Sequence, residues 1–433
     1  MPDYCAIDFG TSNSAVAIPD GLGGTRLVEL EGAFTTMPTA VFYAPDGPVA
    51  TTRHYGRAAI AAYVDGIEGR LMRSMKSILG SDLAQRSTDI GGGHAVKYLD
   101  VVAGYLHHLK RRAEAELGAP IAQAVLGRPV YFVDDDALRD AQAQRVLEAA
   151  ARAVGLAEIS FQYEPIAAAF DYEQTVQREQ IVLVCDIGGG TSDFSVVRVG
   201  PARRRRLERK DDILANHGVH VAGTDFDRRI ELDCILGELG YRSLGPALSG
   251  APPREVPSAV YFDLATWHLI NTVYQPQRVA ELRAMRAFYG DARHHRRLLA
   301  VIDGRFGHEL LARAEAAKIE VAADAPAHVD LALIEPGLSV TLTEGQAGAA
   351  IESELERIVA AAQQTVADAG LRAADVDALY FTGGSTGLRP LAQRIRAAFG
   401  AARAVSGDRF ASVARGLGVH AARRFGDSST ARG

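Results

Sequence analysis

Residues suited to phosphate and metal chemistry gather where an apolar strand meets a glycine turn. The apolar run Ile181–Cys185 is long enough for one buried strand and is followed by Asp186, and Gly188, Gly189 and Gly190 come directly afterwards. Glycine tolerates positive φ and lets a ligand approach the backbone closely. Exposed backbone N–H groups in such a turn can bind an anion. The stretch therefore predicts strand, tight turn and strand, with a phosphate-binding backbone at the turn.

The second half of this hairpin adds further polar side chains. Thr191 and Asp193 precede the apolar run Phe194–Val199, so that the carboxylates of Asp186 and Asp193 flank the turn. Carboxylate oxygens suit a hard cation, which would bridge them to a bound phosphate. A β-hairpin with a flexible tip and no ligand remains the alternative for this stretch taken alone.

A second copy of the pattern stands near the N-terminus. The stretch Cys5–Ile18 is an apolar strand that ends at Asp8, followed by a turn and an alternating strand. Its turn contains Gly10, Thr11, Ser12 and Asn13. Two aspartates at equivalent strand ends indicate a duplicated fold with one phosphate–metal site between its halves.

Composition places the chain among ordinary globular proteins. Its 433 residues are 48% hydrophobic and 23% charged, with a net charge of −6, which argues mildly against nucleic-acid binding. No apolar run approaches the roughly 20 residues of a membrane helix, and no export signal is visible. Cys5, Cys185 and Cys234 form no paired motif, as in a reducing cytosol. We therefore expect a cytoplasmic, monomeric protein without a membrane or nucleic-acid partner.

Periodicity predicts the elements around the two turns. Further strands are expected at Thr25–Leu30, Ala40–Tyr43, Ala124–Gly127 with Val130–Val133, Ile159–Tyr163, Ile213–Val221, Val329–Leu333, Leu338–Thr343 and Ala378–Thr382. Helices are expected at Tyr55–Ala62, Leu71–Leu79, Val96–Leu117, Asp136–Val154, Ile166–Tyr172, Leu310–Val321, Ile351–Ala369, Arg389–Phe399 and Ser412–Ala422. The elements alternate as in an α/β protein.

Two basic clusters have simpler interpretations than binding. Arg203–Lys210 reads R-R-R-R-L-E-R-K between two expected strands, so we predict a solvated hairpin tip and keep an acidic partner as the alternative. His294–Arg297, which we place in a loop, is a weak metal signal.

Five motifs and one lysine, in order along the chain, resemble the ATPase domain of Hsp70 chaperones, in the actin/hexokinase/Hsp70 superfamily. They are Asp8–Thr11, Lys76 in K-S-I-L-G, Glu164–Ala169, Asp186–Thr191, Gly223–Asp227 and, last along the chain, the turn Gly383–Thr386. The resemblance covers nearly the whole chain. It implies an actin-like α/β fold of two duplicated RNase H-like lobes, each with an inserted subdomain, and a cleft between them.

The resemblance implies ATP or ADP with Mg²⁺ as cofactors. Asp8 and Asp186 would hold the metal, mainly through its waters, and Gly10–Asn13 with Gly188–Thr191 would wrap the phosphates. Lys76 would orient the attacking water, and Thr191 would bond the γ-phosphate or the water. Glu164 and Asp193 would complete the acidic ring. The implied catalytic residues are thus Asp8, Lys76, Glu164, Asp186, Thr191 and Asp193.

The implied nucleoside contacts come from later segments. Glu315 and Lys318 match the helix that contacts ribose and base, although taken alone this pair is an ordinary surface ion pair. Gly223 also belongs to the nucleotide-binding set, and the adenine side would be lined by Gly383, Gly384, Ser385 and Thr386. The family usually places Arg directly after this turn, where this chain has Gly387 and carries Arg389 two positions later. Base affinity is therefore the doubtful part of the implied site.

The resemblance also sets expected boundaries. Lobe I would span residues 1–170 with an insertion at about 35–95, and lobe II residues 171–425 with an insertion at about 225–335. Residues 426–433 would form a flexible tail, with no peptide-binding half after it. The insertion of lobe II contains Asp263–His268, where divergence from full-length Hsp70s is expected to be greatest.

These observations favour a slow, Mg-dependent, ATP-hydrolysing Hsp70-like protein that is a chaperone or a chaperone-like regulatory ATPase. Its protein client or co-chaperone is not identifiable from sequence. The alternatives are a small-molecule kinase, an actin-like filament scaffold and a nucleotide-sensing binder with little turnover. No sugar-kinase signature supports the first, and the acidic ring with Lys76 argues against the last.

Overall fold

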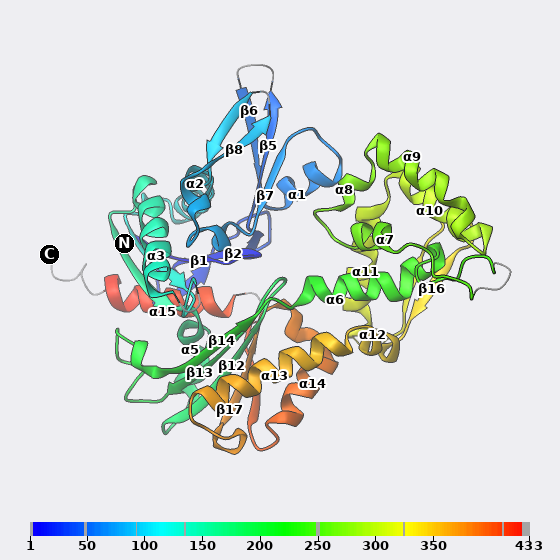
Figure 1. Cartoon of the computed structure of the whole chain (residues 1–433). Helices are drawn as coiled ribbons and strands as arrows, with labels where there is room; N and C mark the ends of the chain where they lie inside the picture. Colours follow the sequence, from blue (N-terminus) through cyan, green and yellow to red (C-terminus); the bar gives the residue numbers. More distant parts are fainter. Residues whose placement is uncertain are drawn as a thin grey trace.

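The computed structural model describes residues 3–46, 50–91, 93–133, 136–247, 252–323, 325–408 and 411–426. Nearly all of the expected C-terminal tail therefore lies outside the described residues. Two mixed sheets form the centres of two lobes, with the first above the second in Figure 1.

The first sheet has the strand order β11-β10-β1-β2-β3, with β4 also paired to β2. Strands β1 and β2 form an antiparallel hairpin, whereas β10 and β11 join in parallel. Strands β1, β2 and β10 are buried almost without interruption along their length, which fits them to a core on both faces of the sheet. The strands are β1 Tyr4–Phe9, β2 Asn13–Pro19, β3 Thr25–Leu27, β4 Thr36–Pro38, β10 Gln123–Arg128 and β11 Glu158–Tyr163.

The second sheet repeats this topology, with the order β14-β13-β12-β17-β18. Its hairpin β12–β13 is antiparallel, β14 extends it, and β17 and β18 join in parallel. The two sheets thus share one order, and the expected duplicated α/β architecture is confirmed. The strands are β12 Gln180–Ile187, β13 Ser192–Val199, β14 Ile213–Val219, β17 Ala378–Thr382 and β18 Arg403–Ser406.

Each lobe carries an insertion on the side of the cleft. The first insertion consists of the sheet β6-β5-β7, helix α1 and the hairpin β8–β9. Its elements are β5 Ala40–Asp46, β6 Ala50–Tyr55, α1 Gly56–Val64, β7 Arg70–Arg73, the short helices η1 Met75–Ile78 and η2 Asp82–Gln85, β8 Ser87–Gly91 and β9 His94–Lys97.

The second insertion is mainly helical and lies at the right of Figure 1. It begins with α6 Gly223–Ile230, which continues into the π-helix η4 Glu231–Ile235 and η5 Leu236–Leu239. The other elements are α7 Ala259–Leu264, α8 Ile270–Val273, α9 Pro276–Ala284, η6 Met285–Phe288, α10 Ala292–Gly304, α11 Gly307–Val321 and the hairpin β15 Ala327–Asp330 with β16 Ser339–Leu342.

Further helices cover and connect the sheets. Helices α2 and α3 share a core with β1 and β10, and α13 packs on β13 and β14. The bounds are α2 Tyr98–Leu117, α3 Ala137–Ala153, α4 Glu164–Ala168, α5 Phe170–Thr175, η3 Lys210–Asp212, α12 Glu344–Ala350, α13 Glu352–Asp368, η7 Ala373–Asp375, η8 Gly384–Gly387, α14 Arg389–Ala398 and α15 Ser412–Phe425.

A shared core joins the lobes at the base of the cleft. Helix α15 follows the second sheet in sequence but packs against β1, β2, β3 and β10 of the first sheet and against α4. The buried cluster at this point combines Val125 of the first sheet, Leu417 of α15 and Val184 of the second sheet. The chain thus passes between the lobes twice, through α4–α5 and through the segment before α15.

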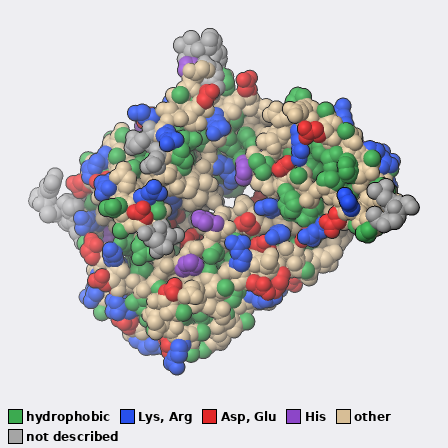
Figure 2. Space-filling view, in the orientation of Figure 1, with side chains coloured by type: hydrophobic (Ala, Val, Ile, Leu, Met, Phe, Trp, Pro, Cys, Tyr) green, Lys and Arg blue, Asp and Glu red, His purple; other side chains and the backbone are tan. Residues whose placement is uncertain are grey.

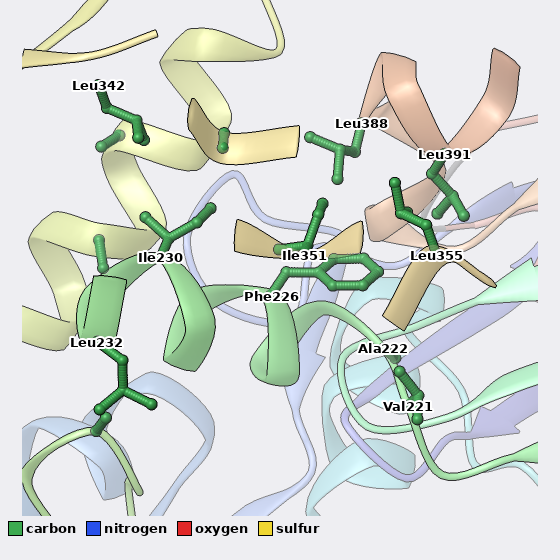
Figure 3. Packing of buried hydrophobic residues seen from close by; sticks show 14 of the residues in the cluster. Val221, Ala222, Phe226, Ile230, Leu232, Leu342, Ile351, Leu355, Leu388 and Leu391 are labelled. Carbon is green, nitrogen blue, oxygen red and sulfur yellow. The ribbon is translucent and has the colours of Figure 1, made fainter. Parts of the chain in front are cut away.

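The core of the second lobe continues into its insertion. Figure 3 shows Phe226 and Ile230 of α6 packed near Ile351 and Leu355, with Leu388 beside them. Ile351 directly precedes α13, and Leu355 lies in its first turn. All five are nearly inaccessible to solvent. Burial of such side chains stabilises a fold by about 1.5–3 kcal/mol each before conformational entropy is subtracted. Helix α6 is therefore firmly attached to the second sheet.

Several expected elements differ in the structure. The apolar run Leu71–Leu79 is not one helix, because Ser74 has φ 52° and separates strand β7 from the 3₁₀-helix η1. Strand β10 ends at Arg128, and the stretch Val130–Val133 is not a strand. Pro129 cannot donate a ladder hydrogen bond, and the Arg128 side chain donates to the carbonyls of Pro129 and Val130 instead.

The basic run Arg203–Lys210 is not simply a solvated tip. Arg209 is 3% exposed and donates to both carboxylate oxygens of Glu173 at 3.0 and 2.8 Å. It also pairs with Asp212, which in turn pairs with Arg203. The solvated interpretation is wrong for these two arginines, because buried acidic partners compensate their desolvation.

Among the helices of the described segments, none is long and apolar enough to cross a membrane.

Candidate nucleotide-binding site

The two predicted glycine turns face each other across the cleft. Asp186 lies directly opposite Asp193 in the register of β12 and β13, and the Gly188 N–H donates to the Thr191 carbonyl at 3.0 Å to close that turn. A Cβ added at Gly189 would lie 3.1 Å from the Ser12 hydroxyl of the first turn. The strand ends of both sheets therefore meet at one place, as their duplicated motifs predicted.

Sterics explain why glycine occupies these turns. A Cβ at Gly10 would lie 2.2 Å from the Asn13 carbonyl oxygen. At Gly383, which has φ +85°, it would lie 2.4 Å from the Ile187 carbonyl and 2.7 Å from the Asp186 carboxylate. Any side chain at Gly383 would therefore displace the end of β12 and its aspartate.

Negative charge is concentrated between the turns. Burial raises the pKa of Asp8 to about 8, and the carboxylates of Glu164 and Asp186 add to the shift while Lys76 opposes it. Burial likewise raises the pKa of Asp186 to about 7, with Asp193 and Glu164 adding to it. Each elevated value means that the ionised carboxylate lacks sufficient positive charge nearby.

Lys76 supplies part of that positive charge. Its Nζ donates to Glu164 Oε1 at 2.6 Å, and both side chains are largely buried. Burial alone would lower the pKa of Lys76, but Glu164, Asp8 and Asp193 outweigh it and leave that pKa raised. The amine is therefore a fixed cation beside the two strand-end aspartates. Nearby, the Thr191 hydroxyl donates to Asp193 at 2.9 Å.

A cavity of about 740 Å³ opens between these groups and extends along the second lobe. It is lined by every residue of the predicted site with two exceptions: Asp8, Gly10, Thr11, Ser12, Asn13, Lys76, Glu164, Asp186, Gly188, Gly189, Thr191, Asp193, Gly223, Glu315, Lys318, Gly383, Gly384 and Ser385. The exceptions are Gly190 and Thr386, which do not line the cavity in the structure. The volume is in the range of sites for small organic ligands.

The middle of the cavity is held by a hydrogen-bonded junction. Gly223 and Thr224 donate their backbone N–H groups to the carbonyls of Gly188 and Gly189 at 3.2 and 2.8 Å. The Ser385 hydroxyl donates to the same Gly188 carbonyl at 2.6 Å. Helix α6 and the turn after β17 are thereby tied to the second glycine turn.

Lys318 pairs with a residue that the sequence did not single out as part of the site. Its Nζ lies 2.6 Å from Asp227 Oδ1 and donates weakly to the Gly223 carbonyl at 3.4 Å. Asp227 is 6% exposed, and burial raises its pKa to about 6 despite Lys318. The interpretation of Glu315 and Lys318 as a mere surface ion pair is therefore wrong, because Lys318 is committed to Asp227 and both residues line the cavity.

The far end of the cavity is apolar, and sequence reasoning missed it. Ile319, Ala322 and Ala323 line it from α11 and the turn after it, Leu388 lines it just before α14, and Val413 lines it from the start of α15. The sequence does contain a signal for this wall, namely helical spacing. Residues 315, 318, 319, 322 and 323 are three or four positions apart and so lie on one face of a helix.

An aromatic bridge crosses the mouth of the cleft beside Glu315. Tyr63 of α1 stacks on Trp267, with centroids 4.7 Å apart, and the Arg73 guanidinium lies 4.5 Å from the Trp267 centroid. His308 packs edge-on to both rings, and burial lowers its pKa to about 4, so that it is uncharged. Arg73 also interacts electrostatically with Glu315.

This bridge joins the two insertions. Figure 1 places α1 next to α8, and Figure 2 shows a small opening between the lobes. The lobes thus touch on both sides of the cleft, at the aromatic bridge and at the shared core.

The residues present fit a hard divalent cation. Asp8 and Asp186 offer oxygen donors from opposite lobes, and their raised pKa values reflect negative charge that such an ion would neutralise. Within the described ranges, no three His, Cys, Asp or Glu side chains converge as direct ligands of one ion. A magnesium ion held mainly through its waters stays a prediction, as do the roles assigned to individual residues.

Comparison with protein families agrees with the geometry. A family model described as Hsp70 protein matches residues 4–240 and 287–431. The chain belongs to the Hsp70 family. Members of this family bind ATP or ADP, generally with Mg²⁺, and are ATPases. The Hsp70 match omits residues 241–286, which contain Asp263–His268 and Trp267, and this agrees with the divergence expected there.

Proposed function

We propose that this protein binds Mg·ATP between its lobes and hydrolyses the terminal phosphate with water. The observation that carries the proposal is the buried Lys76–Glu164 pair beside Asp8 and Asp186, at the point where two glycine turns meet. Fixed charges of both signs in a partly dry cleft are suited to phosphoryl transfer, which depends on positioning and electrostatic stabilisation.

Each group has a role that follows from its position. Backbone N–H groups of the two turns hold the phosphates, and Lys76 stabilises negative charge on the transferred group. Glu164, fixed by its 2.6 Å contact with Lys76, orients a water and accepts its proton. Asp193, bonded to Thr191, lies on the other side of the phosphate-binding turn. The metal, when bound at Asp8 and Asp186, would neutralise charge on the phosphate oxygens.

The proposal extends to the consequence of hydrolysis. The site is built from both lobes, so that loss of the terminal phosphate removes contacts that hold the lobes together. We infer a chaperone-like or regulatory ATPase whose lobe separation depends on the bound nucleotide. Its protein partner is identified by no feature of the described residues.

The test is phosphate release from ATP without any added acceptor, together with calorimetric titration of ATP and ADP. Slow, magnesium-dependent release is expected from the wild type. Lys76→Met is expected to abolish it, whereas Lys97→Met, a matched change at an exposed lysine, leaves it unchanged.

Two outcomes would overturn the proposal. Absence of any ATP binding in calorimetry would remove the nucleotide site altogether. Phosphate transfer that requires an added hydroxyl compound would assign the site to a small-molecule kinase instead.

A further inference from the structure

The cavity wall formed by α11 changes character along its length. Glu315 and Lys318 line it first, and Ile319, Ala322 and Ala323 line it beyond them. These positions share one helical face, so the wall passes from charged to apolar within about two turns. Ile319 is 61% exposed, so its side chain is accessible to a ligand in the cavity.

A second part of the cavity lining is also apolar, and its side chains are buried. Leu388 is 5% exposed and Val413 is 7% exposed, although both line the cavity. Figure 3 shows Leu388 beside Ile351 and Leu391, within the buried core of the second lobe. Gly387, directly before Leu388, contributes backbone and no side chain to this wall. The two walls form a slot with apolar faces.

The hydroxyl groups on this wall are already engaged as donors. Ser385 donates to the Gly188 carbonyl at 2.6 Å, and Ser412 donates to the Asp408 carbonyl. Thr386, which does not itself line the cavity, donates to the Gly383 carbonyl at 2.7 Å. The two lining hydroxyl groups beside Leu388 and Val413 are therefore already committed as donors to backbone carbonyls.

We propose that this slot holds the base of a purine nucleotide by apolar burial without reading its edge, so that ATP and GTP bind with similar affinity. The inference rests on the proposed nucleotide site and names the substrate class of that site as purine nucleoside triphosphates. Discrimination between bases requires groups whose hydrogen bonds are lost with the wrong base. An apolar slot gains from either purine nearly the same buried area.

Specificity in this site then resides in the polar end. Triphosphate and ribose are common to ATP and GTP, and the charged groups Lys76, Lys318 and Glu315 face the part of the cavity where those moieties bind. The base adds affinity through contact with Ile319 and Leu388 but little selectivity.

The experiment is calorimetric titration of the full chain with ATP, GTP and ITP in the presence of magnesium. Dissociation constants within about tenfold of one another are expected, since apolar contacts alone discriminate weakly. ATP binding with GTP more than about a hundredfold weaker would overturn the inference and leave the proposed function intact. Absence of binding by all three would instead overturn the proposed function.

A variant pair tests the location of the base. Ile319→Ala is expected to weaken ATP and GTP alike, by about three- to tenfold, because apolar contact area is lost for both. Ile67→Ala is the matched control, since Ile67 is also exposed, at 49%, and does not line the cavity. Ile319 is too exposed for its truncation to unfold the chain, and melting temperatures of both variants check this.

Unchanged affinities in Ile319→Ala, or loss for one nucleotide alone, would place the base elsewhere and overturn the inference.

Discussion

The two ends of the cavity differ in charge and in the lobes that contribute their residues. At the polar end, Asp8, Asp186, Glu164 and Lys76 come from both lobes, and burial together with neighbouring charges shifts the pKa values of Asp8, Asp186 and Lys76. At the apolar end, Ile319 and Leu388 come from one lobe and carry no charge. The polar end can therefore respond to lobe movement and to phosphate charge, whereas the apolar end can only accept or exclude a shape.

The largest effect is expected from removing charge at the polar end. Asp186→Asn is expected to reduce ATP hydrolysis by about a hundredfold or more, because a preorganised charge at the reacting group is lost. Single-turnover phosphate release measures it. Asp65→Asn, at an exposed position on α1's C-terminal side, is the matched control. Hydrolysis within about threefold of the wild type would show that the polar end is not the reacting end.

Fragments of the nucleotide separate the two ends directly. Inorganic tripolyphosphate with magnesium is expected to displace a fluorescent ADP at concentrations at least about thirtyfold lower than adenosine, because charge-assisted contacts exceed apolar burial here. Lys76→Met is expected to weaken tripolyphosphate and not adenosine, and Ile319→Ala the reverse. Stronger displacement by adenosine would reverse the assignment of the ends.

The pH dependence of stability reports on the polar end alone. The pKa values of Asp8 and Asp186, about 8 and about 7, stand above the ordinary 3.8, so the folded protein without ligand binds more protons than the unfolded chain. The contribution of these two groups to the free energy of unfolding therefore falls as pH rises from about 4 to 8, by up to about 1.4 kcal/mol per pH unit for each group.

Urea denaturation between pH 6 and 8.5 measures this fall. Asp186→Asn removes one titrating carboxylate, so its curve is expected to be flatter than that of the wild type. Parallel curves for the two proteins would contradict the assigned charge at Asp186.

The smallest effect concerns the mouth of the cleft. Trp267→Ala is expected to speed release of a fluorescent ADP by about three- to tenfold, since it removes one ring stack and one cation–π contact between the insertions. Stopped-flow displacement measures it, with Trp267→Phe intermediate. Phe288→Ala, at a 54% exposed ring of the same insertion, is the control. Equal release rates in all four proteins would show that the bridge does not hold the lobes.

The same contrast explains what the sequence could predict. The polar end was predictable because tight turns require glycine and metal binding requires carboxylates. Gly10 and Gly383, like Asp8 and Asp186, can therefore be recognised one position at a time. The duplicated sheets followed from the two copies of that turn. The apolar end was not predictable, because an isoleucine or leucine has the same appearance in a core and in a slot.

Long-range pairing was the other limit. Arg209 was misjudged because its partner Glu173 lies 36 residues earlier, on α5. Asp227 was known as part of a motif, but its commitment to Lys318 depends on how α6 lies against α11. The predicted helix over Leu71–Leu79 is wrong for a local reason. Ser74 adopts a positive φ, and a serine does not signal that conformation in a sequence as a glycine does.

The double passage of the chain at the shared core has a mechanical consequence. The chain connects the lobes at α4–α5 and again before α15, and both connections lie at the shared core. We therefore expect the lobes to rotate relative to each other about the line through these two connections. Points far from that line then move most, and Figure 1 shows the α1–α8 contact well away from α15. Because Trp267 is the only tryptophan in the chain and lies at the α1–α8 contact, its intrinsic fluorescence should report on rotation of the lobes.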